Sequence, residues 1–236
     1  MRRVDEIFTN LYSVVFYRSL RFSNFSDSEG FMIIEIEGID GVGKTTQCEL
    51  LKGHLQQQGR NAVIVKDLES TELGRNVRKV LVGDGSRPPA TELFSFLACK
   101  AQLFSEVVVP TISDGGIVIC DRGIGSLMSY FEFFGFLKPF LLHATELATN
   151  GLRPDITILI DVTVEEATRR KEGKTEQSKF DRMDNEFFRR QRASFLELAE
   201  LPSWVVVDGN LTTEEMHAYI SDLVEKTLFT QTKPLV

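Results

Sequence analysis

The stretch EGIDGVGKTT, residues 37–46, decides the fold. From Gly38 to Thr45 it matches G-x-x-x-x-G-K-[ST], the pattern of a phosphate-binding loop that can hold a nucleoside triphosphate. Its glycines allow backbone angles at which successive N–H groups point at phosphate oxygens. Lys44 adds positive charge near a transferred phosphoryl group, and the Thr45 hydroxyl suits Mg²⁺. The residues expected to contact the nucleotide are Gly38, Asp40, Gly41, Val42, Gly43, Lys44, Thr45 and Thr46.

The residues on either side of this loop have the composition that it requires. Phe31–Ile36 is apolar and partly β-branched, which predicts a strand leading into the loop. Thr46–Gln58 predicts a helix, with Leu51 and Leu55 on one face and Gly59 after its end. The N-terminus of such a helix attracts anions. A strand, glycine loop and helix in this order favour a nucleotide site over a simple turn.

Further strands and helices alternate along the chain. Four more runs predict strands: Asn61–Lys66, Ile117–Cys120, Ile156–Ile160 and Val205–Val207. The helical patterns between them include Thr91–Ser113, where we expect Pro110 to cause a kink. This alternation predicts an α/β fold, a doubly wound sheet of about five parallel strands flanked by helices. Ligands bind such sheets beyond the carboxyl ends of the strands.

The bulk composition excludes several classes of protein. The 236 residues have a formal net charge of −7, which argues against a nucleic-acid-coating or membrane-surface protein. We find no apolar stretch of about 18 residues and expect no membrane span. The three cysteines, Cys48, Cys99 and Cys120, lack metal-ligand spacing and indicate a reducing compartment. We therefore expect a cytoplasmic protein that binds neither nucleic acid nor membrane.

The chain divides into one domain with two short ends. Residues 1–30 form an N-terminal extension, either a short helix followed by a Ser/Asn-rich linker or the product of a misassigned start, because Met32 opens the first strand. We expect a chain beginning at Met32 to fold and to keep full activity. Residues 31–229 form the nucleotide-binding domain, and residues 230–236 form a tail.

A second polar motif, ICDRG, places Asp121 and Arg122 directly after a buried strand. Asp121, with Thr45, can hold Mg²⁺ or its water, and Arg122 can bind a phosphate with two parallel hydrogen bonds. The simpler alternative is an ion pair at the end of the strand. Asp40 puts a carboxylate inside the phosphate loop, which suits a position facing a sugar hydroxyl or the metal.

Five segments together resemble the thymidylate kinase family. EGIDGVGKTTQ, LFSFLACKAQ, ICDRG followed by SLMSY, RPDITILIDV and FDRMDNEFFRRQRASFLELA occur in this order between about Met32 and Leu228. The resemblance implies a nucleoside monophosphate kinase fold of the P-loop NTPase type. It further implies transfer of the γ-phosphoryl group of ATP to the 5′-phosphate of dTMP, with Mg²⁺, usually by a homodimer.

The resemblance also assigns substrate-binding residues. Asp40 matches the carboxylate near the acceptor sugar, and Arg122 the arginine on the acceptor phosphate. Phe96 matches the ring that stacks on the base, and Lys100 the position that reads the base edge; the two are four residues apart, on one helix face. Tyr130 matches the tyrosine that disfavours a 2′-hydroxyl. Phe96 and Tyr130 could instead be ordinary core residues.

A cation-rich segment, Arg169–Arg182, has the character of a lid that closes over phosphates. A solvated loop is the alternative. The phosphate loop has no arginine at Ile39–Val42, which in this family goes with catalytic arginines in the lid. Arg169 and Arg170 are candidates, and Arg182 is our first choice. The expected catalytic residues are therefore Lys44, Arg122, Asp40 and Arg182.

Several acceptor-side positions depart from the family pattern. Glu69 stands where an arginine usually meets the acceptor phosphate, with Lys66 as the nearest cation. Lys100 replaces an arginine and loses two-pronged recognition. Leu127 and Phe131 replace polar residues. We therefore expect dTMP as acceptor with weak discrimination among pyrimidines. A kinase for another pyrimidine or a modified deoxynucleotide, and a nucleotide-binding regulator without transfer, remain alternatives.

Overall fold

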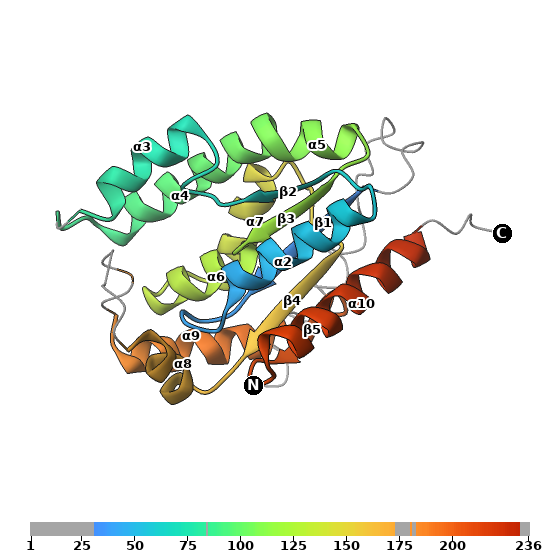
Figure 1. Ribbon diagram of the computed structural model, residues 1–236. Coiled ribbons are helices and arrows are strands. Elements are labelled where there is room, and N and C mark those ends of the chain that lie inside the picture. The colour runs from blue at the N-terminus through green and yellow to red at the C-terminus, as the bar shows by residue number, and fades with distance from the viewer. Residues whose placement is uncertain (1–30, 84, 173–179, 181–182, 232–236) are drawn as a thin grey trace, which may run out of the picture.

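The computed structural model describes residues 31–83, 85–172, 180 and 183–231. Its centre is a five-stranded parallel sheet in the order β2-β3-β1-β4-β5 (Figure 1). All five expected strands form, and the predicted doubly wound α/β fold is confirmed. The strands are β1 Met32–Glu37, β2 Ala62–Val65, β3 Ile117–Asp121, β4 Ile156–Asp161 and β5 Trp204–Asp208.

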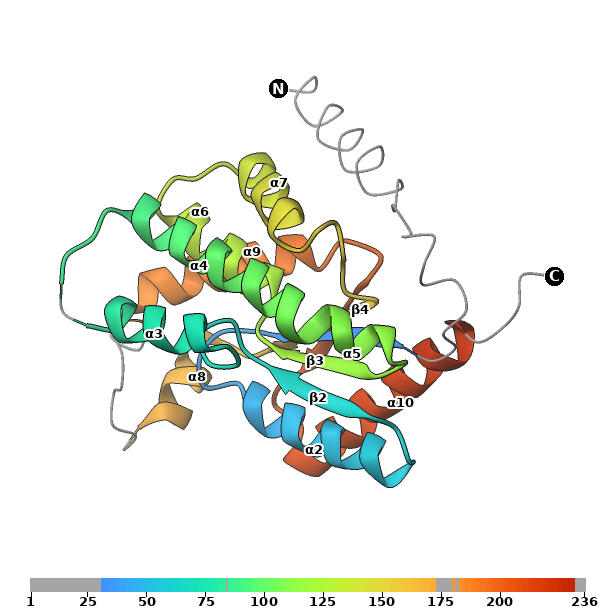
Figure 2. The ribbon, with the colours of Figure 1, turned by 90° about the horizontal axis from the view of Figure 1, so that it is seen from above.

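Helices cover both faces of the sheet. Figure 2 shows α2 and α10 together on one side, and α4, α5, α6, α7 and α9 on the other. This double cover explains why β1 and β3 are buried along their whole length on both faces. The helices are α2 Lys44–Gln57, α3 Glu72–Leu81, α4 Pro89–Leu103, the π-helical turn η1 Phe104–Val108, α5 Val109–Ser113, α6 Ile124–Phe133, α7 Lys138–Ala148, α8 Val164–Lys171, α9 Asn185–Leu198 and α10 Thr213–Gln231.

The strand register places the two polar motifs side by side. β1 lies between β3 and β4, and near their carboxyl ends Ile36 pairs with Asp121 and Glu37 pairs with Leu159. The phosphate loop after β1 therefore begins next to the Asp121–Arg122 turn after β3. This is the edge of the sheet at which ligands bind in open parallel sheets.

The long apolar helix differs in detail from the expectation. It begins at Pro89, a favoured first helical residue, and widens into the π-helical turn η1 just before Pro110. Proline lacks the N–H that would continue the regular ladder, so a disturbance in the turn before it is the expected result.

By length and composition alone, this helix could span a membrane. Within the described parts of the chain it is the one helix that passes this test. Its most apolar 18-residue stretch has a mean hydropathy of 1.4, and 39% of that stretch is buried. Our expectation that no stretch would qualify was therefore wrong. The helix contains the buried charged residues Glu92 and Lys100, and its α5 end packs against β3. These contacts are those of a core helix.

The central strand contains two buried acidic residues, Glu35 and Glu37, which are 2% and 0% exposed. Buried carboxyl groups need hydrogen-bond partners. Glu35 accepts hydrogen bonds from the Ile124 backbone N–H at 3.1 Å and from the Thr157 hydroxyl at 3.4 Å. Burial, helped by the charge of Glu37, raises the pKa of Glu35 from 4.5 to about 7.

This raised pKa predicts a pH-dependent effect of Glu35→Gln. Between pH 4.5 and about 7 the folded protein retains a proton that the unfolded chain releases, so wild-type stability falls as the pH rises through this window. Glutamine does not titrate. The unfolding free energy of the variant minus that of wild type should therefore grow by about 2 kcal/mol between pH 5 and pH 8. Urea denaturation at both pH values measures it, and an equal difference at both would contradict the assignment.

Candidate active site

The phosphate loop is formed by backbone that only glycine adopts easily. Gly38, Gly41 and Gly43 have φ angles of +140°, +99° and +101°. A Cβ on Gly38 would lie 2.5 Å from the carbonyl oxygen of Ile160, so that position also lacks room for a side chain. The helix α2 begins at Lys44, two residues earlier than the sequence predicted, which directs its N-terminus at the loop.

Lys44 is buried inside this loop, with 6% of the residue exposed. Its ammonium donates hydrogen bonds to the carbonyl oxygens of Gly38 at 2.9 Å and Ile39 at 2.8 Å. Burial lowers the pKa of Lys44 to about 8, with a further lowering by Arg122, against the opposing charge of Asp40. Asp40 balances the charge of this buried ammonium only in part. The negative charge of a bound phosphate would raise the pKa of Lys44 again and keep the ammonium protonated.

The two candidate metal ligands, Thr45 and Asp121, lie in contact. The Thr45 hydroxyl donates to Asp121 Oδ2 at 2.6 Å, and the Lys66 ammonium lies 2.8 Å from the same oxygen. Burial opposes ionisation of Asp121, but the hydrogen bonds from Lys66 and Thr45 hold its pKa below the usual value. The oxygen that already attracts Lys66 can attract another cation. Within the described residues, no cluster of three or more His, Cys, Asp or Glu side chains could hold a metal.

Arg122 occupies a strained turn, with a φ angle of +78°. A buried carboxylate secures the residues after it: Glu37 Oε1 accepts from the backbone N–H groups of Gly123 at 2.9 Å and Ser126 at 2.7 Å. Its other oxygen accepts from the Ser126 hydroxyl at 2.5 Å. A non-glycine residue in this region costs about 1–3 kcal/mol, and these hydrogen bonds offset that cost.

The turn brings Arg122 against Asp40 of the phosphate loop, and the two form an ion pair. Burial alone would raise the pKa of Asp40, but the charges of Arg122, Lys44 and Lys171 outweigh it and hold the pKa below its usual value. Two residues 82 positions apart in sequence are therefore joined across the two motifs. The other nitrogen of Arg122 donates to the Ser126 hydroxyl at 3.2 Å.

An aromatic cluster contains the two rings that the sequence assigned to acceptor binding, Phe96 and Tyr130. The ring centroid of Phe96 is 6.4 Å from that of Tyr130 and 6.1 Å from that of Phe180, a residue of the expected lid. The Tyr130 hydroxyl donates to Glu92 at 3.1 Å, and burial raises its pKa. The structure thus places Phe96 and Tyr130 together, and it adds Phe180 and Glu92, which sequence reasoning did not single out.

Lys100 is directed at other groups than its sequence position suggested. It is 2% exposed, and its ammonium lies 2.9 Å from a carboxylate oxygen of Asp67 and 5.9 Å from the ring centroid of Phe104. Burial would lower its pKa, but the charges of Asp67 and Glu35 outweigh burial and raise it. Contact with a base edge therefore stays a prediction for Lys100. Leu127 and Phe131 are both core residues.

Glu69 lies among cations. Its carboxylate is 3.4 Å from Arg78 Nε and 4.0 Å from the Lys66 ammonium, and its carbonyl oxygen accepts from Arg75 at 3.0 Å. Arg75 and Arg78 are on the helix that follows Glu69, and the sequence analysis did not name them. Positive charge is therefore present around the position where the family arginine is missing.

Only part of the expected lid lies in the described residues. Arg169 and Arg170 both form ion pairs with Glu166, a residue of the same helix, α8. Arg182 lies outside the described residues. Lys171, by contrast, packs on the phosphate loop: a Cβ added to Gly41 would lie 3.1 Å from Lys171 Cγ. Its ammonium is 4.2 Å from the ring centroid of Phe188. Lys171 belongs to the expected lid segment, and the sequence analysis did not name it as a candidate.

Comparisons with known proteins agree on one family. Residues 36–220 match the family described as "Thymidylate kinase". The chain is 36% identical over 201 residues to a thymidylate kinase of Thermoanaerobacter sp. (strain X514), an alignment that covers 83% of this chain and 98% of that protein.

Two further relatives, one bacterial and one from Pyrococcus abyssi, give the same result. A thymidylate kinase of Caldanaerobacter subterraneus subsp. tengcongensis is 36% identical over 204 residues, with 83% and 95% of the two chains covered. A "Probable thymidylate kinase" of Pyrococcus abyssi is 34% identical over 205 residues, with 84% and 98% covered.

The first test of this site is Lys44→Ala. Lys44 is buried inside the loop and would supply positive charge to a transferred phosphoryl group, so its loss should lower kcat by about 10²- to 10³-fold or more. The fold should stay intact, as circular dichroism can verify. Near-normal turnover of a well-folded variant would remove the phosphate loop from the reaction.

The second test is Lys171→Met, which keeps most of the side-chain length and removes the charge near Asp40 and Gly41. We expect kcat to fall about tenfold or more, because a cation over the phosphates would be lost. Lys226→Met is the matched control, since Lys226 lies on α10 with 71% of its side chain exposed. Equal turnover in the two variants would show that Lys171 has no role in transfer.

Proposed function

The chain belongs to the thymidylate kinase family and is a nucleoside monophosphate kinase, and from this premise we propose that it transfers the γ-phosphoryl group of ATP to dTMP, giving dTDP. The observation that supports this most directly is the Asp40–Arg122 ion pair. It joins the loop that would hold the donor phosphates to an arginine positioned beyond the neighbouring strand, where an acceptor phosphate would lie.

Each polar residue then has a separate task. Backbone N–H groups of the loop and the Lys44 ammonium would bind the donor phosphates and stabilise charge on the transferred group. The guanidinium of Arg122 would bind the acceptor phosphate with two parallel hydrogen bonds, and Asp40 would keep it aligned. Such positioning of two phosphates in line supplies most of the catalysis in phosphoryl transfer.

Magnesium fits the oxygen atoms that are present. Thr45 and Asp121 would hold it, because Mg²⁺ usually takes one or two protein oxygens and completes its shell with water and phosphate. When bound it would neutralise charge on the donor phosphates. The contact of Lys66 with Asp121 supports a cation at this position.

The acceptor base would stack on Phe96, and Tyr130 would lie near the sugar and disfavour a 2′-hydroxyl. Stacking does not distinguish bases, so selection depends on hydrogen bonds at the base edge. Lys100 is already paired with Asp67, and Leu127 and Phe131 offer no polar group. We therefore propose that dTMP is preferred with weak discrimination among pyrimidines. No specific contact favours the other two candidates, a kinase with a different principal acceptor and a regulator without transfer.

Large apolar side chains exposed on three neighbouring helices support a homodimer. Phe94 on α4 and Leu147 on α7 are 60% and 71% exposed, and Val80 on the neighbouring α3 is 59% exposed. α4 packs against both α3 and α7, and large apolar side chains exposed on neighbouring helices commonly mark a protein interface. A second copy would cover the exposed face of the long helix. The buried, unpaired cysteines support a cytoplasmic location.

The acceptor is tested by ATP consumption against a panel of monophosphates. We expect the highest kcat/KM with dTMP, smaller values with dUMP and dCMP, and the lowest with the ribose form of thymidylate. A preference for dTMP over dUMP above about 10⁴-fold would show a tightly hydrogen-bonded base site and contradict weak discrimination. Absence of stimulation by any monophosphate would contradict the kinase proposal itself.

The dimer is tested by sedimentation of the wild type and Phe94→Glu. Wild type should sediment at twice the 26.7 kDa chain mass, and the variant should sediment as a monomer because a buried unpaired charge opposes association. Tyr219→Glu, at an exposed position on α10, is the control and should stay dimeric. A monomeric wild type would contradict the proposal.

A further inference from the structure

A cavity of about 220 Å³ lies on the face of the sheet that α6, α7 and α9 cover. Its walls come from these helices, from Glu35 of β1, from the segment before β4 and from the beginnings of β4 and β5. No residue of the phosphate loop lines it. The cavity is therefore separate from the proposed nucleotide site.

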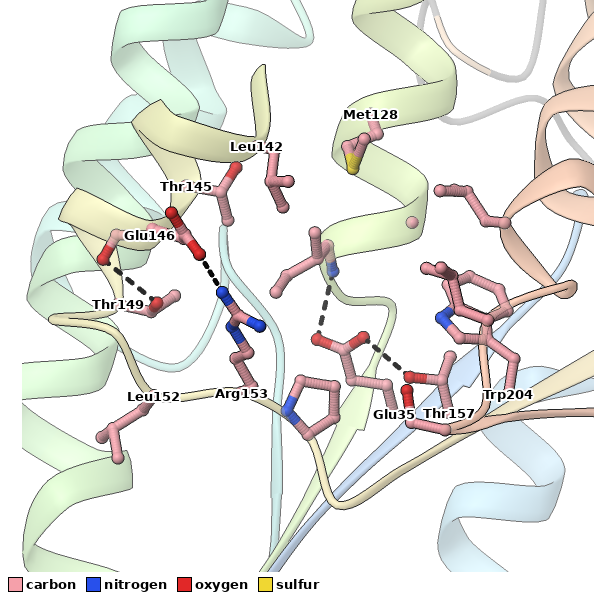
Figure 3. A pocket seen from close by; sticks show the side chains of 16 residues that line it. Glu35, Met128, Leu142, Thr145, Glu146, Thr149, Leu152, Arg153, Thr157 and Trp204 are labelled. Atoms are coloured by element: carbon pink, nitrogen blue, oxygen red, sulfur yellow. Dashed lines mark hydrogen bonds and ion pairs between the residues drawn. The ribbon is translucent and has the colours of Figure 1, made fainter. Parts of the chain in front are cut away.

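Most of the cavity wall is apolar, and one aromatic ring, that of Trp204, forms part of it. Figure 3 shows Met128 and Leu142 on one side of the cavity and Trp204 on another. Trp204 is the only tryptophan in the chain. An aromatic ring of this size offers a flat surface against which a planar ligand can stack.

Above about pH 7, where the Glu35 carboxyl is ionised, the charged side chains that the described residues contribute to the wall carry an excess of one negative group. Arg153 and Glu146 form an ion pair with each other, as Figure 3 shows. The third is Glu35, whose partners within the cavity wall are the uncharged Ile124 N–H and Thr157 hydroxyl. Lys100 lies near Glu35 but is paired with Asp67. A carboxylate has about four lone-pair sites, so Glu35 can accept further hydrogen bonds.

We propose that this cavity binds a small planar cation of the amidine type, whose N–H groups bond Glu35 and whose ring packs against Trp204. A forked cationic donor matches a carboxylate, and a flat apolar body matches the rest of the wall. The volume is smaller than that of pockets for drug-sized ligands, which begin at about 300 Å³, and it suits a compact ligand of roughly ten non-hydrogen atoms.

The cavity is also connected to the turn that holds Arg122. The first residue of α6, Ile124, bonds Glu35, and the second, Gly125, lies so close to Trp204 that a Cβ there would be 2.6 Å from the ring. A ligand that draws Glu35 away from Ile124 would disturb this first turn and, two residues earlier, Arg122. The structure therefore assigns the ligand an effect on acceptor binding. This second step rests on the proposed function, whereas binding does not.

Binding is tested by Trp204 fluorescence with benzamidine as the probe and benzamide, its uncharged isostere, as the matched probe. At pH 8, where Glu35 is ionised, we expect a saturable change with benzamidine and at least tenfold weaker binding of benzamide. Glu35→Gln should remove this preference, and Leu142→Phe, which narrows the cavity, should weaken both. Equal binding of the two probes, or the same benzamidine affinity in Glu35→Gln, would overturn the proposal, as would an unchanged Trp204 signal.

The effect of the cavity ligand on acceptor binding is tested by the KM for dTMP of the wild type with and without saturating benzamidine. We expect at least a threefold rise in this KM, an unchanged KM for ATP, and no effect of benzamidine in Glu35→Gln. Binding without a change in the KM for dTMP would overturn the coupling. Should dTMP not be a substrate, the proposed function fails, and the fluorescence titration still decides whether the cavity binds the cation.

Discussion

The arrangement of this site depends on one buried carboxylate, that of Glu37. It stands at the end of the central strand, fully buried, and bonds the backbone of Gly123 and both the backbone and the hydroxyl of Ser126. These three bonds fix the turn after β3 in a shape that Arg122 would not adopt unaided. A buried carboxylate is costly unless it is fully hydrogen-bonded, so Glu37 and the turn stabilise each other.

From this constraint the two halves of the site follow. Once the turn is fixed, Arg122 pairs with Asp40. This ion pair holds Arg122 in a fixed position relative to the phosphate loop. Asp121, one residue earlier, meets Thr45 at the start of α2. The parallel register of β1 and β3 makes both contacts possible, because it aligns the carboxyl ends of the two strands. The geometry of the site thus follows from the strand order and from the hydrogen bonds between Glu37 and the turn after β3.

The sequence predicted what depends on local pattern. The glycine loop, the five strands and the Asp121–Arg122 motif each have a signature within about ten residues. Contacts that join distant elements could not be read this way: Lys66 with Asp121, Lys171 with Gly41, and Lys100 with Asp67. Lys100 had a family position but no visible partner, since Asp67 lies 33 residues away. The roles of the site residues stay predictions, and Arg182 and residues 1–30 lie outside the described residues.

The central claim is that Glu37 positions the acceptor arginine, and the KM for dTMP in Glu37→Leu tests it most directly. Leucine offers no hydrogen-bond acceptor to Gly123 and Ser126, so the KM for dTMP should rise at least tenfold. The KM for ATP should change less than twofold. Glu37→Gln keeps an acceptor for the two N–H groups and should restore most of the wild-type value. Wild-type KM values for dTMP in a folded Glu37→Leu protein, or equal rises in both KM values, would contradict the account.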